Sequence, residues 1–331
     1  MKKIFSIMMT LTLGIAAWGS ETVTVRLAEG IEEGALKTKI EQTMSAILTE
    51  ALSAHESKRN MNYTALGLGE DAQSSLSMLW ENSPFIPMDY EIVEKCLTTG
   101  TGYQVRNISL ELTDAPEDDN YKQGVFNFDK RGNLRSFNLA IDNNLYMNVI
   151  KENKELIDLE RRHLILDYVE QFRTAYNQKD RKFLRAIFSD DALIITGKVE
   201  PGKMKDGIKV PDKITLEPMG KEKYLQRLFK VFDLNKYIRV TFDEIKVMAH
   251  PNENYKDFYG VTLHQGYSSD RYHDDGYLFL LWDFRNPSRP LIHVRTWQPD
   301  AYDKDGSGMK TRIDEDEILG IEDFTNLDII D

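Results

Sequence analysis

Four stretches of strand-forming residues follow one another near the end of the chain, and they restrict its fold more than any other feature. They cover residues 238–249, 258–268, 276–284 and 290–298. The connections are short and rich in Pro, Asn, Asp and Gly, which favour turns. Consecutive strands with short links pair antiparallel, because a parallel crossover needs about a dozen residues or more. We therefore predict an antiparallel meander.

Amphipathic helical segments precede this meander. The first starts in the charged stretch 151–162 and continues to Tyr176, the second covers 183–188 and the third covers 221–233. Their apolar residues recur at helical spacing, which is typical of helices packed on one face of a sheet. Residues 192–196 read as a strand, and 197–213, rich in Pro, Gly and Lys, as a long loop. Three helices on a curved antiparallel sheet predict a cone-shaped α+β domain over 151–331.

Residues 20–150 are predicted to form a smaller α+β domain of unknown type. A strand at 22–27 and helices at 30–57 and 72–80 precede strand-like segments that follow Gly100. Residues 129–133 have the composition of a β-hairpin turn. We expect helices on a small antiparallel sheet. Two domains agree with the chain length of 331 residues, since one domain takes about 100–200 residues.

The first 19 residues have the pattern of a secretory signal peptide. Lys2 and Lys3 precede an apolar run at 4–16, and Ala17 and Gly19 supply small residues at the expected cleavage positions. No later apolar run is long enough to span a membrane. We therefore expect a soluble bacterial protein that is exported to the periplasm or the extracellular space.

Charge and cysteine content exclude other classes. The chain has 42 Lys+Arg against 54 Asp+Glu, a formal net charge of -12, which disfavours nucleic-acid binding. Residues 300–331 hold eleven acidic and three basic side chains, so we expect an acidic, solvated tail. Cys96 has no cysteine partner in the chain and is expected to pack as a small apolar side chain.

The C-terminal half contains the segments YVEQF at 168–172, NQKD at 177–180 and IFSDDA at 187–192. This order of helix, polar turn, helix, Asp-Asp-Ala and strand resembles the nuclear transport factor 2-like superfamily. That superfamily includes ketosteroid isomerases, dehydratases and many non-catalytic members. The resemblance covers about residues 156–328 and implies the cone-shaped fold. It implies little about function, because such a fold carries many unrelated chemistries.

The resemblance allows one direct test of catalysis. In ketosteroid isomerases an Asp base follows the Asp-Asp-Ala motif, and that position is Thr196 here. The Tyr of the family's oxyanion hole aligns with Phe172. Neither residue has the required chemistry, because Thr cannot abstract a carbon-bound proton and Phe has no donor for an oxyanion. A non-catalytic protein that binds a small molecule or a protein partner is therefore the preferred prediction.

Polar and aromatic residues on the inner helices and strands are the candidates for lining a pocket. Asp283 is the most unusual, because its strand face is otherwise apolar, and a buried carboxylate needs a partner such as Arg295 or His264. One alternative is an enzyme of lyase or hydrolase type with Asp283 and His264 as an acid–base pair. Another is a self-associating module that forms a homodimer through an exposed sheet face. The candidate pocket residues are Tyr176, Tyr224, His264, Asp283, Arg295 and Trp297.

No metal or cofactor is expected. The chain lacks zinc-ligand spacings, a Walker loop and a dinucleotide fingerprint. Residues 303–308 resemble the first half of a calcium loop, with Asp at the first and third positions and Gly at the sixth. However, the twelfth position is Asp314 instead of Glu, and a strand precedes the loop instead of a helix. We therefore predict an ordinary Asp/Gly/Ser loop.

Overall fold

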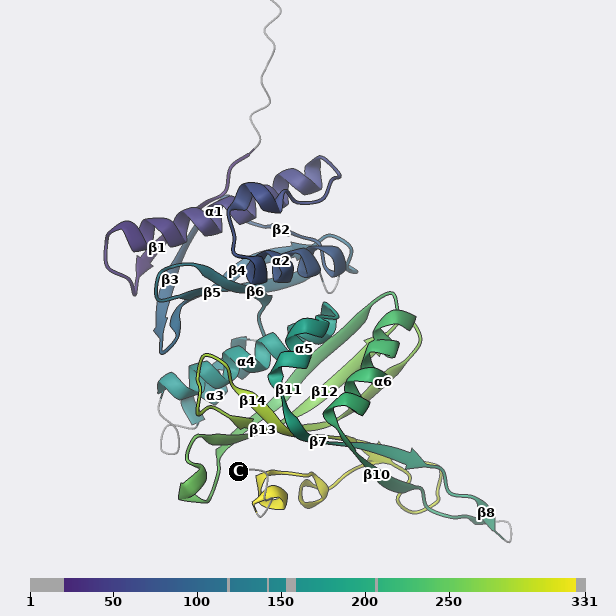
Figure 1. The fold of residues 1–331 in the computed structure, drawn as a ribbon. Coiled ribbons are helices and arrows are strands. Elements are labelled where there is room, and N and C mark those ends of the chain that lie inside the picture. Colours follow the sequence, from purple (N-terminus) through teal and green to yellow (C-terminus); the bar gives the residue numbers. More distant parts are fainter. Residues whose placement is uncertain (1–20, 118–119, 142, 153–158, 206–207, 326–331) are drawn as a thin grey trace, which may run out of the picture.

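The computed structural model describes residues 21–117, 120–141, 143–152, 159–205 and 208–325 (Figure 1). The predicted signal peptide lies outside these ranges. Among the described residues, no helix has the length and apolar character needed to cross a membrane. The described chain has two mixed α+β units, each built on its own sheet.

The N-terminal unit has a sheet in the order β1-β3-β4-β5-β6, with β2 paired to β4. β1 runs parallel to β3, whereas the other strand pairs are antiparallel, so the prediction of a wholly antiparallel sheet is wrong for this edge. The reason is the long crossover through two helices, which brings β3 back beside β1 in the same direction. The strands are β1 (Thr24–Glu29), β2 (Phe85–Pro87), β3 (Glu91–Thr99), β4 (Gly102–Leu112), β5 (Tyr121–Asp129) and β6 (Leu134–Leu139).

Helices α1 (Ala35–Glu56) and α2 (Glu70–Asn82), joined through the short η1 (Tyr63–Leu66), pack on this sheet. Ile40, Met44 and Ile47 are fully buried, as their helical spacing predicts. Cys96 lies in the same core, and burial raises the pKa of its thiol to about 11. Cys96 is therefore a packed apolar side chain.

The C-terminal sheet has the order β10-β7-β14-β13-β12-β11. The predicted meander is confirmed, because β11 to β14 pair antiparallel in sequence order. β14 then pairs parallel with β7, and β10 forms the far edge. The strands are β7 (Phe188–Glu200), β10 (Lys213–Gly220), β11 (Ile238–Ala249), β12 (Phe258–Ser269), β13 (His273–Asp283) and β14 (Leu291–Pro299).

The predicted long loop at 197–213 is wrong for most of its length. β7 continues to Glu200, and the short strands β8 (Met204–Lys205) and β9 (Ile208–Lys209) extend the hairpin into a projecting arm (Figure 1). Pro201 and Pro211 stand at the strand ends, and Pro218 is on an edge strand, where a missing N–H is tolerated. The Pro and Gly content of this segment is typical of a loop, so the sequence did not indicate the hairpin.

Helices α4 (Leu159–Asn177), α5 (Arg181–Ile187) and α6 (Lys221–Leu234) cover the inner face of this sheet, together with α3 (Asn143–Glu152) (Figure 1). The predicted α+β cone is confirmed. Its interior is packed with large side chains, since Phe172, Phe188 and Trp282 are almost fully buried. Residues of α3 belong to this core, whereas the N-terminal core ends at Leu139; the predicted boundary at 150 stays a prediction.

The outer face of the same sheet is covered in part by the chain's own C-terminal segment. Phe324 of η4 (Ile321–Phe324) stacks on Phe279, with ring centroids 5.4 Å apart, and Ile321 packs beside it. The acidic tail is thus anchored by buried apolar residues. The exposed face assumed for a homodimer is covered there, and the homodimer itself stays a prediction.

Candidate functional site

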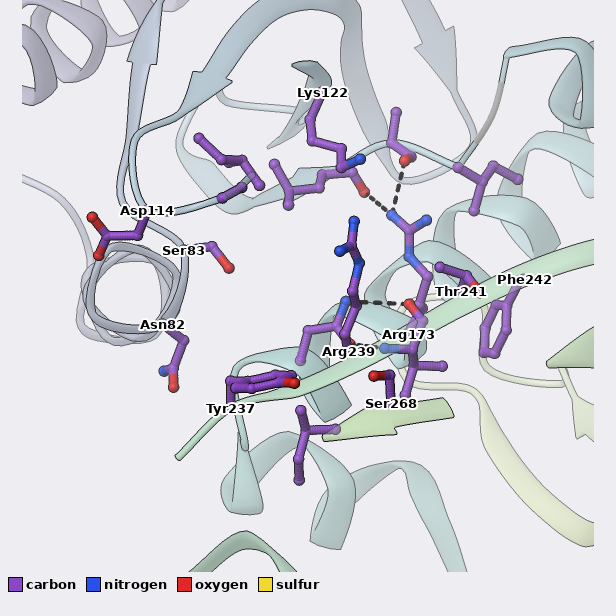
Figure 2. Close-up of a pocket in the computed structure, with 18 of the residues that line it drawn as sticks. Asn82, Ser83, Asp114, Lys122, Arg173, Tyr237, Arg239, Thr241, Phe242 and Ser268 are labelled. Carbon is purple, nitrogen blue, oxygen red and sulfur yellow. Dashed lines mark hydrogen bonds between the residues drawn. The ribbon is translucent and has the colours of Figure 1, made fainter. Parts of the chain in front are cut away.

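The two units meet around a cavity of about 750 Å³ (Figure 2). Its walls come from the end of α2, the segment between β4 and β5, the end of β6, the C-terminal part of α4 and the start of β11. Small-molecule sites commonly have volumes of about 300–1,000 Å³ and lie at domain interfaces. The cavity is therefore the candidate site.

Three cationic side chains from three elements line this cavity: Lys122 of β5, Arg173 of α4 and Arg239 of β11 (Figure 2). Burial lowers the pKa of Arg173. Burial and the neighbouring charge of Arg173 together lower the pKa of Lys122. The described lining residues include one carboxylate, Asp114, which is exposed at the rim. The cavity therefore has a positive potential in a protein whose net charge is negative.

Hydrogen bonds fix the elements that carry these cations. The Arg173 guanidinium donates to the carbonyl oxygens of Leu139 and Ala140, at 2.6 and 2.8 Å. The Asn177 side chain accepts the Val240 N–H at 2.6 Å and donates to the Val240 carbonyl at 3.3 Å. These contacts tie α4 both to the end of the N-terminal sheet and to β11. The cavity walls are thus preorganised.

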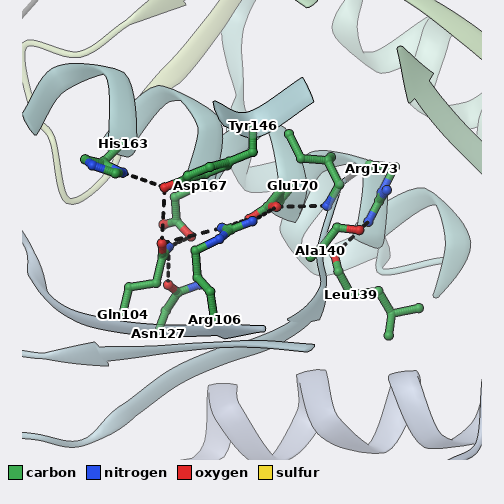
Figure 3. Close-up of polar contacts among 11 residues, drawn as sticks. Gln104, Arg106, Asn127, Leu139, Ala140, Tyr146, His163, Asp167, Glu170 and Arg173 are labelled. Atoms are coloured by element: carbon green, nitrogen blue, oxygen red, sulfur yellow. Dashed lines mark hydrogen bonds and ion pairs between the residues drawn. The ribbon is translucent and has the colours of Figure 1, made fainter. Parts of the chain in front are cut away.

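Beside the cavity, α4 packs on the N-terminal sheet through buried polar groups (Figure 3). Arg106 of β4 makes two hydrogen bonds to the Glu170 carboxylate, at 2.7 and 2.8 Å, and the Ile141 N–H donates to Glu170 at 2.9 Å. Glu170 is 0% exposed, so this ion pair is fully desolvated. It fixes one face of α4 against the sheet.

Further along α4, Gln104 donates to both Asn127 and Asp167, and Tyr146 shares a short hydrogen bond with His163 (Figure 3). Burial and the nearby Glu170 charge raise the pKa of Asp167 to about 7. Perturbed groups of this kind often mark active sites. The cavity beside them, however, has a volume of about 10 Å³, which is room for about one water molecule. The cluster therefore serves the interface, not a ligand.

Of the predicted pocket residues, Tyr176, Tyr224 and Arg295 come together inside the cone. The two tyrosine hydroxyls are hydrogen-bonded, and the Arg295 guanidinium lies 5.0 Å from the Tyr224 ring centroid. Trp297 lies two residues further along β14 and pairs with Leu278, on the inner face. Neither of the two cavities described above contains these residues.

His264 and Asp283 lie elsewhere. His264 contacts the carboxylates of Asp243 and Asp300, at 3.0 and 3.4 Å. On β13, Asp283 is six residues from Tyr277, the register partner of His264, which places the two side chains about 20 Å apart. The predicted acid–base pair is therefore wrong, because the two side chains are far beyond hydrogen-bond reach of each other.

Asp283 is paired with Arg285, beside which the end of its strand was expected to lie, and not with Arg295 or His264. Arg285 donates to its carboxylate from Nη2 at 2.8 Å and from Nε at 2.9 Å, and His293 Nε2 lies 3.5 Å away. A bulge in β14 places His293 beside Asp283 and turns Arg295 to the opposite, inner face. Burial opposes ionisation, but the nearby His293 ring and the hydrogen bonds from Arg285 prevail and lower the pKa of Asp283 to about 2. Asp283 is thus a poor general base.

Phe172 and Thr196, the residues at the two isomerase positions, lie among packed side chains of the cone. Phe172 packs edge-on against Phe188 and Trp282, with ring centroids 6.0 and 6.3 Å away. Thr196 pairs with Trp297 on the neighbouring strand. Both residues are part of the packing of the cone.

The loop that resembles a calcium site is bound by a lysine side chain from the arm. Asp303 is 1% exposed, and its carboxylate accepts the N–H groups of Gly306 and Gly308, each at 2.8 Å. The Lys209 ammonium of the arm binds the same carboxylate. No group of three or more acidic, His or Cys side chains suited to a metal occurs in the part of the chain that is described. The loop therefore fastens the arm to the tail.

Sequence reasoning missed Lys122, Arg173 and Arg239. They lie in three different elements, and they meet only because the two units pack together. The available signal was weak: Arg239 lies near the start of the predicted strand 238–249, and Arg173 lies near the end of the amphipathic helix that ends near Tyr176.

No family model and no curated protein matches this chain. Similar solved structures include a nuclear transport factor 2-like protein of Cytophaga hutchinsonii, with TM-score 0.31 and 15% identity over 42% of this chain and 97% of that chain. A conserved protein of Planctomyces limnophilus has TM-score 0.29 and 16% identity, over 46% and 96%. A Bdellovibrio bacteriovorus protein has TM-score 0.32 and 14% identity, over 61% and 77%. Such low similarity transfers no activity.

Proposed function

We propose that this protein is a non-catalytic binding protein whose ligand is a small anionic molecule held in the cavity between its two units. The observation that supports the proposal is the convergence of Lys122, Arg173 and Arg239 on a cavity of about 750 Å³. Cations in a partly enclosed cavity attract anions strongly, because the surrounding protein screens charge less than water does.

The non-catalytic part of the proposal rests on three observations. Thr196 and Phe172 occupy the positions of the isomerase base and oxyanion donor. Asp283 and His264 are far apart. The cavity lining holds no nucleophile–base pair among the described residues. Preorganised walls suit binding and orientation of a ligand.

Isothermal titration calorimetry with the purified protein tests this. Inorganic phosphate, citrate and glucose 6-phosphate are the anionic probes, and glucose is the neutral control. At least one anion should bind, glucose should not, and affinity should fall as sodium chloride rises. The double variant Lys122→Met/Arg239→Met should weaken binding at least about tenfold, because charged hydrogen bonds contribute about 1.5–3 kcal/mol each.

Lys130→Met is the matched control, since Lys130 is an exposed cation in the β5–β6 turn, outside the cavity. It should bind like the wild type. Equal binding of glucose and glucose 6-phosphate, or unchanged affinity in the double variant, would contradict the proposed ligand class.

We also propose that the protein acts after export. The support is the sequence pattern Lys2, Lys3, the apolar run 4–16 and Gly19. Intact-mass analysis of protein secreted from an expressing bacterium should give a chain that begins at Ser20. Material that stays in the cytoplasm with residue 1 retained would refute export.

A further inference from the structure

Arg295 is a permanently charged side chain inside the cone. Its register neighbours are Leu280 on β13 and Ile194 on β7, and both are fully buried core residues. Register neighbours on adjacent strands face the same side of a sheet, so the Arg295 side chain enters the apolar interior. Only 5% of Arg295 is exposed. A guanidinium stays protonated in proteins, so a full positive charge is buried here.

The neighbours of this guanidinium are aromatic, not acidic. Its central carbon lies 5.0 Å from the Tyr224 ring centroid, and Tyr176 is the second polar side chain close to it. Within the described residues, no carboxylate forms an ion pair with Arg295, and its buried Nε–H and Nη1–H have no acceptor. Buried charges are normally paired, because desolvation of an unpaired ion is costly.

The tyrosine hydroxyls add a further donor to the same place. Tyr176 and Tyr224 are hydrogen-bonded to each other through their hydroxyl oxygens. Each hydroxyl carries one proton, and the bond between them uses one, so the second O–H is left to donate elsewhere. Burial raises the pKa of Tyr176 well above its ordinary value, which keeps that hydroxyl protonated. The cluster therefore presents donors and one positive charge, with no negative charge to balance them.

We propose that Arg295, Tyr176 and Tyr224 form a binding site for a small monovalent anion, either a halide or the carboxylate group of an organic acid. Such an anion would accept from Arg295 Nε–H and Nη1–H and from the remaining tyrosine O–H, in charge-assisted hydrogen bonds. These residues do not line the cavity between the units, so the inference is independent of the proposed function.

Bromide is the first probe, because it can be located by anomalous scattering. Crystals of the wild-type protein soaked in sodium bromide should show a bromide ion within hydrogen-bond reach of Arg295 Nε or Nη1. Bromide sites elsewhere on the protein, with none at Arg295, would rule out a halide as the ligand of this site. Sodium acetate in the same crystals, with carboxylate density at Arg295, would assign the site to organic acids. Neither anion at Arg295 would overturn the proposal.

Thermal unfolding gives an independent measurement in solution. At constant ionic strength, bromide or acetate replacing p-toluenesulfonate, a bulky anion without a carboxylate, should raise the melting temperature of the wild type by a few degrees, with saturation. Arg295→Met should lose this rise, and Tyr224→Phe, which keeps the ring, should need a higher anion concentration. Arg312→Met is the control, because Arg312 is an exposed cation paired with Glu244. Equal anion-dependent rises in the wild type and in Arg295→Met would refute the site.

Discussion

The buried ion pair between Arg106 and Glu170 gives the most direct test of how the two units hold together. Its carboxylate is 0% exposed and accepts two guanidinium hydrogen bonds, at 2.7 and 2.8 Å. In Arg106→Met, Glu170 keeps the N–H of Ile141 as a donor. The variant also loses the stacking of Arg106 on Tyr146, whose ring centroid lies 3.7 Å from the guanidinium carbon.

Removing one partner of a buried pair costs about 3–5 kcal/mol, because the remaining charge is left desolvated. We therefore expect Arg106→Met to lower the free energy of unfolding by about that amount. Urea denaturation followed by circular dichroism measures it. In Arg106→Met/Glu170→Met both charges are gone, so most of the lost stability should return.

The exposed pair of Arg59 with Glu50 provides a matched control. Arg59→Met should cost about 1 kcal/mol or less, because exposed ion pairs contribute little. The reasoning is refuted if Arg106→Met costs no more than Arg59→Met. It is also refuted if the double variant is as unstable as the sum of its two single variants.

Three further variants test separate features. The pKa of Asp167 is raised to about 7, so between about pH 4 and pH 7 the folded state holds a proton that the unfolded state has lost, and stability falls as pH rises through this window. Asp167→Asn should remove this part of the fall in melting temperature between pH 5 and pH 8, and parallel wild-type and variant curves would contradict it. Phe324→Ala should cost about 3 kcal/mol in urea unfolding and increase self-association in light scattering, because it uncovers Phe279 on the outer sheet face. Asp303→Asn should speed proteolytic cleavage within residues 203–212, since the variant loses the ion pair that fastens the arm through Lys209; unchanged cleavage would speak against that role.

Periodic segments with short links were predictable. The strands between 238 and 298 and the helices that bury Ile40 or Phe172 follow from alternating or helical apolar spacing, which local physics fixes. The arm was not predictable, because Pro and Gly at strand ends look like loop residues. The parallel pairing of β1 with β3 was also hidden, since it depends on where two helices return the chain.

Some features of the candidate site were also predictable from the sequence, and others were not. Tyr176, Tyr224 and Arg295 were predicted as pocket residues from their elements, and they do meet. His264 of β12 and Asp283 of β13 lie far apart along these neighbouring strands, and only the register between the strands determines that distance. The charged cavity depends on packing between residues far apart in sequence, such as Arg173 with Leu139, and no local pattern records that distance.

The polar character of the contact between the N-terminal sheet and α4 has a practical consequence for dissection of the chain. Separating two units with an apolar interface would expose an aggregation-prone hydrophobic surface. Separating these two units would instead expose polar side chains, which are Arg106, Gln104 and Asn127 on the sheet and Asp167 and Glu170 on α4. Such surfaces are readily hydrated. A cut between the units should therefore yield two fragments that remain in solution and recombine through their matched charges, which makes the chain suited to fragment complementation.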